Sequence, residues 1–265
     1  MRGLLTIAWQ EISKRWVLLP AALALGLVPL VLARVGCYDS YYSPYNAYQN
    51  VAAVVQLALV TISYVIAFAI GMGVLGTPLH DGRIAFYFAR PVSAIAIVIG
   101  KVAGALALIV TMEGLLAMRS LAIQSEDQIS ANLTLEILVG VAFLGAGLVV
   151  GILARSKSRW FIADALGAIT VTFEFTKLLD RINIVEMKYR FARLEKARPL
   201  FDQVSTLLIG MLAAAIVALF LAAGVAIVIG RTDQERAHRA MSITLWSCLI
   251  AIGAIGFAIG QWGLQ

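Results

Sequence analysis

The chain of 265 residues is 61% hydrophobic, only 14% of its residues are charged, and its mean hydropathy is +0.90. These values exclude an ordinary soluble domain and predict an all-α polytopic membrane protein. The formal net charge is +6, but basic residues that gather in cytoplasmic loops explain it without a nucleic-acid partner.

The chain begins with a predicted amphipathic helix over residues 2–15, in the stretch RGLLTIAWQEISKRW. One stripe at helical spacing is apolar and consists of Leu5, Ala8, Trp9, Ile12 and Trp16; the opposite stripe is polar and consists of Thr6, Gln10, Ser13 and Lys14. This pattern, with two tryptophans in the apolar stripe, favours a helix that lies in the cytoplasmic interface of a membrane. The alternative is that the segment only extends the first membrane span.

Seven apolar segments approach the roughly 20 residues that a helix needs to cross the hydrocarbon core. They cover about 16–35, 51–77, 94–118, 133–154, 160–178, 203–230 and 241–262. The fifth is the weak one, because Asp164, Glu174 and Lys177 lie in or beside it. Either all seven segments cross the bilayer, or segment 160–178 is re-entrant and six cross.

We expect the chain in the inner membrane of a bacterium, and the distribution of its basic residues favours a cytoplasmic N-terminus. With seven crossings, the cytoplasmic side holds the basic residues Arg2, Lys14, Arg15, Arg83, Arg90, Arg155, Lys157, Arg159, Arg231, Arg236 and Arg239. The segment 177–203 departs from this rule, because it would lie outside with seven Lys and Arg residues. We expect seven crossings, since longer loops obey the charge rule less strictly.

Small residues recur at four-residue spacing inside the apolar segments, a pattern that lets helix backbones approach closely. The pairs are Gly100 and Gly104, Gly147 and Gly151, and Gly256 and Gly260. Packing within one subunit and dimerisation both explain them.

Charged residues within the spans are functional candidates. Lys101, near the start of the third segment, can snorkel to the cytoplasmic interface. Glu113 lies near the outer end of the same segment, where it can reach outer water. Glu174 lies three residues from Lys177, so the two side chains can pair on one helical face.

Motifs of self-contained enzymes are incomplete in this chain. The stretch DGRIA at 81–85 begins like the motif of membrane CDP-alcohol phosphotransferases, but only one of its three carboxylates is present. The two histidines, His80 and His238, are far apart in sequence and lack further zinc ligands. Gly100-Lys101 lacks the rest of a phosphate-binding loop. The sequence therefore predicts no catalytic residues, no metal site and no cofactor in this chain.

The stretch LHDGRIAFYFARPVS, residues 79–93, separates two of the most apolar segments. Its part RIAFYFAR can form two helical turns that present aromatic and basic side chains together, as surfaces that bind a partner protein do. The candidate docking residues are His80, Asp81, Arg83, Phe86, Tyr87, Phe88, Arg90 and Pro91. The alternative is a solvated turn with incidental aromatics.

The order of these elements resembles the membrane subunit of ATP-binding-cassette exporters of the type-2 permease family. The resemblance rests on the interfacial helix LLTIAWQEISKRW, two spans, and then GTPLHDGRIAFYFARPVSAIAIVIGK. Within the last stretch, the positions typical of the family are Asp81-Gly82, Phe86 to Phe88, Pro91-Val92-Ser93 and Gly100-Lys101. The match covers about residues 1–230.

The resemblance implies a six-span permease domain over 1–230, with segment 79–93 as a coupling helix that docks on a separate ATPase. ATP and Mg would be bound by that partner. The second cytoplasmic turn, with Arg155, Lys157 and Arg159, would lie near the same ATPase, and short outer helices would occupy about 177–203. A second permease copy or a paralogous permease would complete the path, and accessory subunits could join the complex.

Residues 231–265 depart from a plain six-span permease, because they add a cytoplasmic linker and an extra span. Two other functions stay open. One is a non-transporting membrane anchor or regulatory subunit of a larger complex, and the other is a secondary carrier.

Overall fold

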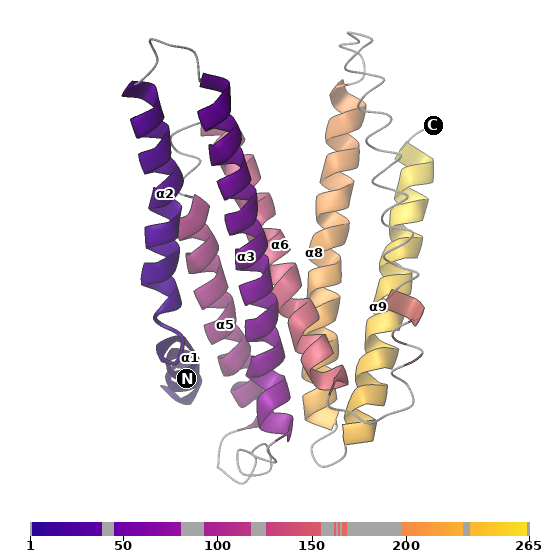
Figure 1. Cartoon of the computed structure of the whole chain (residues 1–265). Helices are drawn as coiled ribbons and strands as arrows, with labels where there is room; N and C mark the ends of the chain where they lie inside the picture. The colour runs from indigo at the N-terminus through magenta and orange to yellow at the C-terminus, as the bar shows by residue number, and fades with distance from the viewer. Residues whose placement is uncertain are drawn as a thin grey trace. The chain divides into compact units, whose positions relative to one another are not determined.

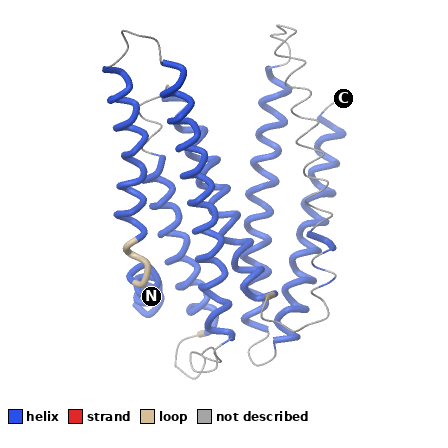
Figure 2. Tube along the Cα trace, viewed as in Figure 1, coloured by secondary structure: helices blue, strands red, loops and turns tan. Residues whose placement is uncertain are grey.

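The computed structural model describes residues 2–38, 45–80, 93–117, 126–154, 162, 164, 166–168, 198–229 and 234–263. Every regular element in these ranges is a helix, which confirms the predicted all-α class (Figures 1 and 2). The helices are α1 (Arg2–Ser13), α2 (Leu18–Tyr38), α3 (Tyr45–His80), α5 (Ala94–Ala117), α6 (Glu126–Leu153), α8 (Arg198–Ile229) and α9 (Gln234–Gly263).

Five of these helices are long and apolar enough to cross a membrane. Their apolar windows are Ala58–Leu75, Ile95–Leu116, Leu133–Leu153, Ile209–Ile229 and Glu235–Gly256. In α2 the described apolar stretch, Leu18–Val28, is shorter. Large apolar side chains such as Val65, Val217 and Ile250 are exposed on these helices, as hydrocarbon surroundings permit. The chain is therefore a multi-pass membrane protein.

The fifth predicted span, 160–178, falls almost entirely outside the described residues. The described positions within it, 162, 164 and 166–168, are helical. The number of crossings, six or seven, stays a prediction.

The chain divides into two compact units, Met1–Arg155 and Ser156–Gln265. The first contains α1 to α6 and the second contains α8 and α9. The domain boundary that the family resemblance predicts at residue 230 stays a prediction.

In the first unit, α3 and α6 pack closely because glycines lie where the two backbones meet. A Cβ atom built on Gly147 would meet the backbone oxygen of Phe68, and one built on Gly151 would lie 2.6 Å from the oxygen of Met72. Gly71 on α3 faces the oxygen of Leu144 in the same way. The pair Gly147 and Gly151 thus serves packing within the chain.

The N-terminal helix α1 lies across the first turns of α5 (Figure 1). Gly100 and Gly104 make this approach possible, because a Cβ atom on Gly100 would lie 3.1 Å from Ile7 and one on Gly104 would meet the backbone of Ala8. Lys14 to Val17 form a turn between α1 and α2. The predicted separate N-terminal helix is confirmed, and the alternative of an extended first span is wrong.

The apolar stripe of α1 divides between two environments. Leu5, Trp9 and Trp16 are 67%, 69% and 61% exposed and face away from the protein, as an interfacial helix requires. Ala8 instead packs on Gly104.

In the second unit, α8 and α9 pack against each other. A Cβ atom on Gly256 of α9 would lie 2.6 Å from the sulfur of Met211 on α8. Gly256, one of the small residues that the sequence analysis singled out, thus also serves packing between two helices of the same chain.

Candidate functional site

Most of the predicted coupling residues lie outside the described residues. These are Asp81, Arg83, Phe86, Tyr87, Phe88, Arg90 and Pro91 of the first cytoplasmic segment and Arg155, Lys157 and Arg159 of the second. The intramembrane candidates Glu174 and Lys177 are not described either. Of the predicted outer helices at 177–203, residues 177–197 are not among the described residues, and the rest belong to the start of α8 at Arg198.

The two ends of segment 79–93 are described. The helix α3 ends at His80, whose side chain is not among those described, and α5 begins at Ala94. Ser93 is the N-cap of α5, because its side-chain oxygen accepts a hydrogen bond of 3.2 Å from the backbone N–H of Ala96. The serine of the Pro-Val-Ser stretch thus starts the third predicted span.

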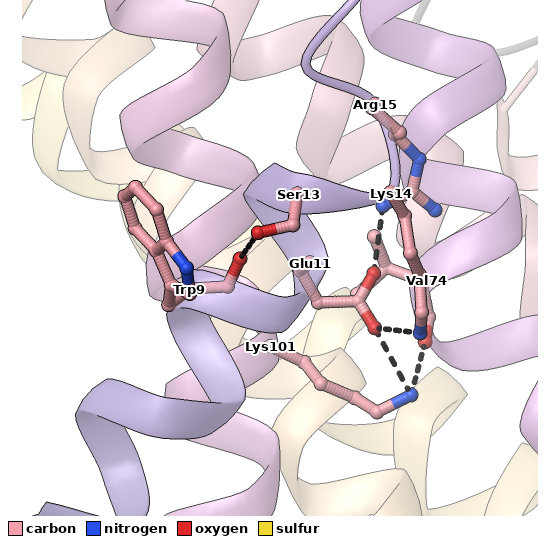
Figure 3. Close-up of polar contacts among 7 residues, drawn as sticks. All are labelled: Trp9, Glu11, Ser13, Lys14, Arg15, Val74 and Lys101. Carbon is pink, nitrogen blue, oxygen red and sulfur yellow. Dashed lines mark hydrogen bonds and ion pairs between the residues drawn. The ribbon is translucent and has the colours of Figure 1, made fainter.

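A partly buried polar cluster joins α1 and the turn after it to the ends of α3 and α5 that flank this segment (Figure 3). We call Glu11, Lys14, Arg15 and Lys101 the α1 clamp. Glu11 Oε1 lies 3.0 Å from Lys14 Nζ and 3.6 Å from Lys101 Nζ, and Glu11 Oε2 lies 2.7 Å from an Arg15 guanidinium nitrogen. One carboxylate therefore binds three cations.

Lys101 also donates a hydrogen bond of 3.4 Å to the backbone oxygen of Val74 on α3. Its side chain is only 7% exposed. The prediction that Lys101 reaches the cytoplasmic interface stays a prediction. The structure adds that α1 covers the start of α5 and brings a carboxylate to the buried ammonium. A buried charge is stable only with such a partner.

Glu11 stays ionised in this setting. Burial raises the pKa of its carboxyl group, but the hydrogen bond from Lys14, the charge of Lys101 and the hydrogen bond from Arg15 together lower the pKa below its ordinary value of 4.5. Glu11 was not among the residues that the sequence singled out. Its spacing of three and four residues from Lys14 and Arg15 is a signal that could have found it.

The intramembrane candidate Glu113 lies between α5, α3 and α6. It is 2% exposed, so the prediction that it reaches outer water is wrong. Ser63 on α3 donates a hydrogen bond of 3.3 Å to Glu113 Oε2, and a Cβ atom on Gly140 of α6 would lie 2.9 Å from Oε1. The absence of a side chain at Gly140 leaves room for the carboxyl group inside the helix bundle.

A third buried carboxylate, Asp164, is held in the second unit by three side chains of α9. We call Asp164, His238, Ser242 and Trp246 the Asp164 cluster. His238 Nε2 lies 2.6 Å from Asp164 Oδ2, the Ser242 hydroxyl donates to the same oxygen at 2.7 Å, and the Trp246 indole N–H donates to Oδ1 at 2.7 Å.

The three partners of Asp164 follow at four-residue steps and therefore lie on one face of α9. A side chain at Gly167 would collide with the Trp246 ring, so the helical segment around Asp164 lies close against this face. The sequence singled out Asp164 as a weakness of the fifth span and did not connect it with α9. The polar positions 238, 242 and 246 at the start of the last span were the signal that was missed.

Serine, histidine and aspartate also form hydrolase triads, but the connectivity here differs. In a triad the serine hydroxyl donates to the imidazole. Here it donates to the carboxylate, and also lies 3.1 Å from the backbone oxygen of His238. The arrangement binds the carboxylate and does not activate the hydroxyl.

Comparisons of the chain with protein-family models, with curated proteins and with solved structures find no match.

Among the described residues, no group of three or more His, Cys, Asp and Glu side chains could hold a metal ion. The polar clusters of both units instead fasten helices to one another. The α1 clamp is the cluster next to the segment that the sequence predicts to bind a partner, and it is the candidate functional site.

Proposed function

We propose that the chain is the permease subunit of an ATP-driven exporter of the type-2 ATP-binding-cassette kind. In this proposal it lies in a bacterial inner membrane with a cytoplasmic N-terminus and pairs with a second permease. A separate ATPase docks on segment 79–93. The multi-pass helical fold is compatible with this role.

The observation that carries the proposal is the position of the α1 clamp. Val74 lies six residues before the end of α3, and Lys101 lies seven residues after the start of α5. At 1.5 Å per residue, both are roughly 10 Å along the helix from segment 79–93. A force applied to this segment by a partner would therefore reach two helices that Lys101 and Glu11 hold together.

The motif residues that suggested the family have roles at this joint. Ser93 caps α5, Gly100 admits Ile7 of α1, and Lys101 pairs with Glu11. These contacts support the proposal because they join the N-terminal helix to the two membrane helices that flank the predicted coupling segment.

Co-purification tests the proposal. The tagged full-length chain would be extracted from its native membrane in mild detergent, and proteins bound to it would be identified by mass spectrometry. We expect an ATPase with nucleotide-binding motifs in stoichiometric amount. Its absence would contradict the proposal.

A double variant tests whether the ATPase binds segment 79–93. Phe86→Ala with Tyr87→Ala should leave the protein inserted and folded but release the ATPase, because buried aromatic anchors often contribute about 2 kcal/mol or more each to a protein interface. The control is Phe143→Ala, which alters an exposed aromatic residue within the apolar window of α6. If the double variant binds and stimulates the ATPase normally, segment 79–93 is not the coupling helix.

The same preparation distinguishes an exporter from a membrane anchor. An exporter subunit should change the rate of ATP hydrolysis by its partner when both are reconstituted in vesicles. Stable association without any effect on hydrolysis would favour the anchoring or regulatory function.

A further inference from the structure

We propose that the polar face of α9, formed by His238, Ser242 and Trp246, is a binding surface for the fifth predicted span of the same chain and keeps Asp164 inside the membrane. Segment 160–178 then stays in the bilayer only together with α9. This role belongs to the C-terminal helix by which the chain departs from a plain six-span permease, and it does not depend on the exporter function.

Asp164 makes insertion of the fifth segment unfavourable unless its carboxyl group is bound. An aspartate near the centre of a membrane helix lowers the inserted fraction roughly a hundredfold. The Asp164 side chain is 8% exposed, and each of the three side chains that bind it comes from α9. The Ser242 hydroxyl and the Trp246 indole N–H both donate to it at 2.7 Å. A hydrogen-bonded carboxyl group costs less in hydrocarbon than one without such donors.

The positions of these two donors place Asp164 well inside the bilayer. The apolar window of α9 begins at Glu235, so Ser242 and Trp246 lie roughly 10 and 17 Å along the helix from its start. The hydrocarbon core is about 30 Å thick. The carboxyl group that both side chains bind therefore lies about a third to a half of the way through the core.

The face of the segment opposite Asp164 is apolar and exposed. Ile162 and Leu166 lie two residues before and after Asp164 and are 67% and 62% exposed. Gly167 lies against the Trp246 ring, where a side chain would collide. The described positions thus have one face in contact with α9 and one exposed apolar face, as a helix does that packs on a neighbour and otherwise faces lipid.

Thiol labelling of the full-length protein in lipid nanodiscs tests the surface. Leu166→Cys, in a chain with Cys37→Ser and Cys248→Ala, places a thiol at an exposed position of the segment. A water-soluble maleimide should label it slowly, because the position lies in hydrocarbon. The same reagent should label Arg236→Cys, exposed at the start of α9, rapidly, and both thiols should react in SDS.

The decisive variant removes two donors from α9. Ser242→Ala with Trp246→Phe leaves α9 more apolar, so α9 itself still crosses the membrane. The loss of one hydrogen bond changes the population of chains whose segment has left the membrane about fivefold. Loss of both should raise the labelling rate of Leu166→Cys roughly twentyfold.

Two further variants separate this role from general damage to α9. Thr244→Val is the matched control, because the Thr244 hydroxyl donates to the backbone oxygen of Ala240 at 2.8 Å, and this variant should leave the labelling rate unchanged. Asp164→Leu should restore slow labelling in the double variant, since the carboxyl group that requires the donors is gone.

Three results would overturn the proposal. The first is rapid labelling of Leu166→Cys when α9 is unchanged, which would place the segment in water. The second is an unchanged rate in the double variant. The third is a rise in rate that persists with Asp164→Leu, which would show that the double variant disrupts α9 itself.

Discussion

At the scale of single residues, the hydrogen-bond donors and acceptors of the Asp164 cluster decide which substitutions this buried site tolerates. The indole of Trp246 can only donate, so the atom at Oδ1 must accept. The atom at Oδ2 meets His238 Nε2 and the Ser242 hydroxyl, and both of these groups can either donate or accept. An amide in place of the carboxylate can therefore keep all three contacts.

We expect Asp164→Asn to lower the free energy of unfolding by less than about 1 kcal/mol, and Asp164→Ala by about 2–3 kcal/mol. The alanine variant leaves the imidazole and the indole N–H without the group that they bind, and an unsatisfied buried polar group costs about 1–3 kcal/mol. Thermal unfolding of the detergent-solubilised variants measures the difference. If asparagine destabilises the protein as much as alanine does, the negative charge itself is required.

The pH dependence of Glu11 gives a second prediction at this scale. Because hydrogen bonds and nearby cations lower the folded-state pKa of Glu11, ionisation of this carboxyl group stabilises the fold above about pH 4.5. The stabilisation is lost as the pH falls through the lowered pKa, since the carboxyl group is then protonated in both states.

Glu11→Gln should therefore be less stable than wild type near neutral pH, by about 1–3 kcal/mol, because Lys101 stays buried without a counter-charge. The gap between the two proteins should close as the pH falls below the folded-state pKa. Melting temperatures over a pH series measure it. Glu235→Gln, at an exposed position of α9, is the control and should show no such gap. A gap that is constant over pH would contradict the assigned role of the charge.

At the scale of helices, glycines determine which pairs approach closely, and two of them form a matched test. A Cβ atom at Gly147 would meet the backbone of Phe68, whereas one at Gly114 on α5 would meet nothing within 4 Å. Alanine favours a helix over glycine by about 1 kcal/mol. Gly114→Ala should therefore be neutral or stabilising.

Gly147→Ala should be destabilising, by about 1–3 kcal/mol, because the backbones of α3 and α6 must separate to admit the methyl group. Parallel thermal unfolding of the two variants in the same detergent provides the measurement. Equal stability of both variants would show that α3 and α6 do not depend on close contact at this position.

The helices themselves could be predicted from the sequence, and their contacts could not. Six of the seven segments predicted from their apolar length lie in helices, and periodicity correctly predicted a separate N-terminal helix, α1. Hydropathy says nothing about which helices meet, so it could not bring Glu11 to Lys101 or Asp164 to His238. For the same reason Asp164 weakened the prediction of span 160–178, although His238, Ser242 and Trp246 of α9 bind its carboxylate.

At the scale of the whole molecule, the consecutive helices α8 and α9 constrain the topology. They pack against each other, and only residues 230–233 separate them, so they run antiparallel. Both are long and apolar enough to cross the bilayer. The start of α8 at Arg198 and the start of α9 at Gln234 must then lie on opposite sides of the membrane.

This arrangement predicts that single cysteines at Lys188 and Arg236 report opposite sides, because Lys188 precedes α8 by ten residues. The background is Cys37→Ser, and Cys248 lies within the apolar window of α9, where a membrane-impermeant reagent does not reach it. With seven crossings, Lys188→Cys should react with an impermeant thiol reagent in intact cells and Arg236→Cys should not. With six crossings, the pattern should reverse, and segment 177–203 would then be cytoplasmic.

Both cysteines should react in permeabilised cells, which controls for their accessibility. Reaction of both or of neither in intact cells would contradict the antiparallel crossing of α8 and α9.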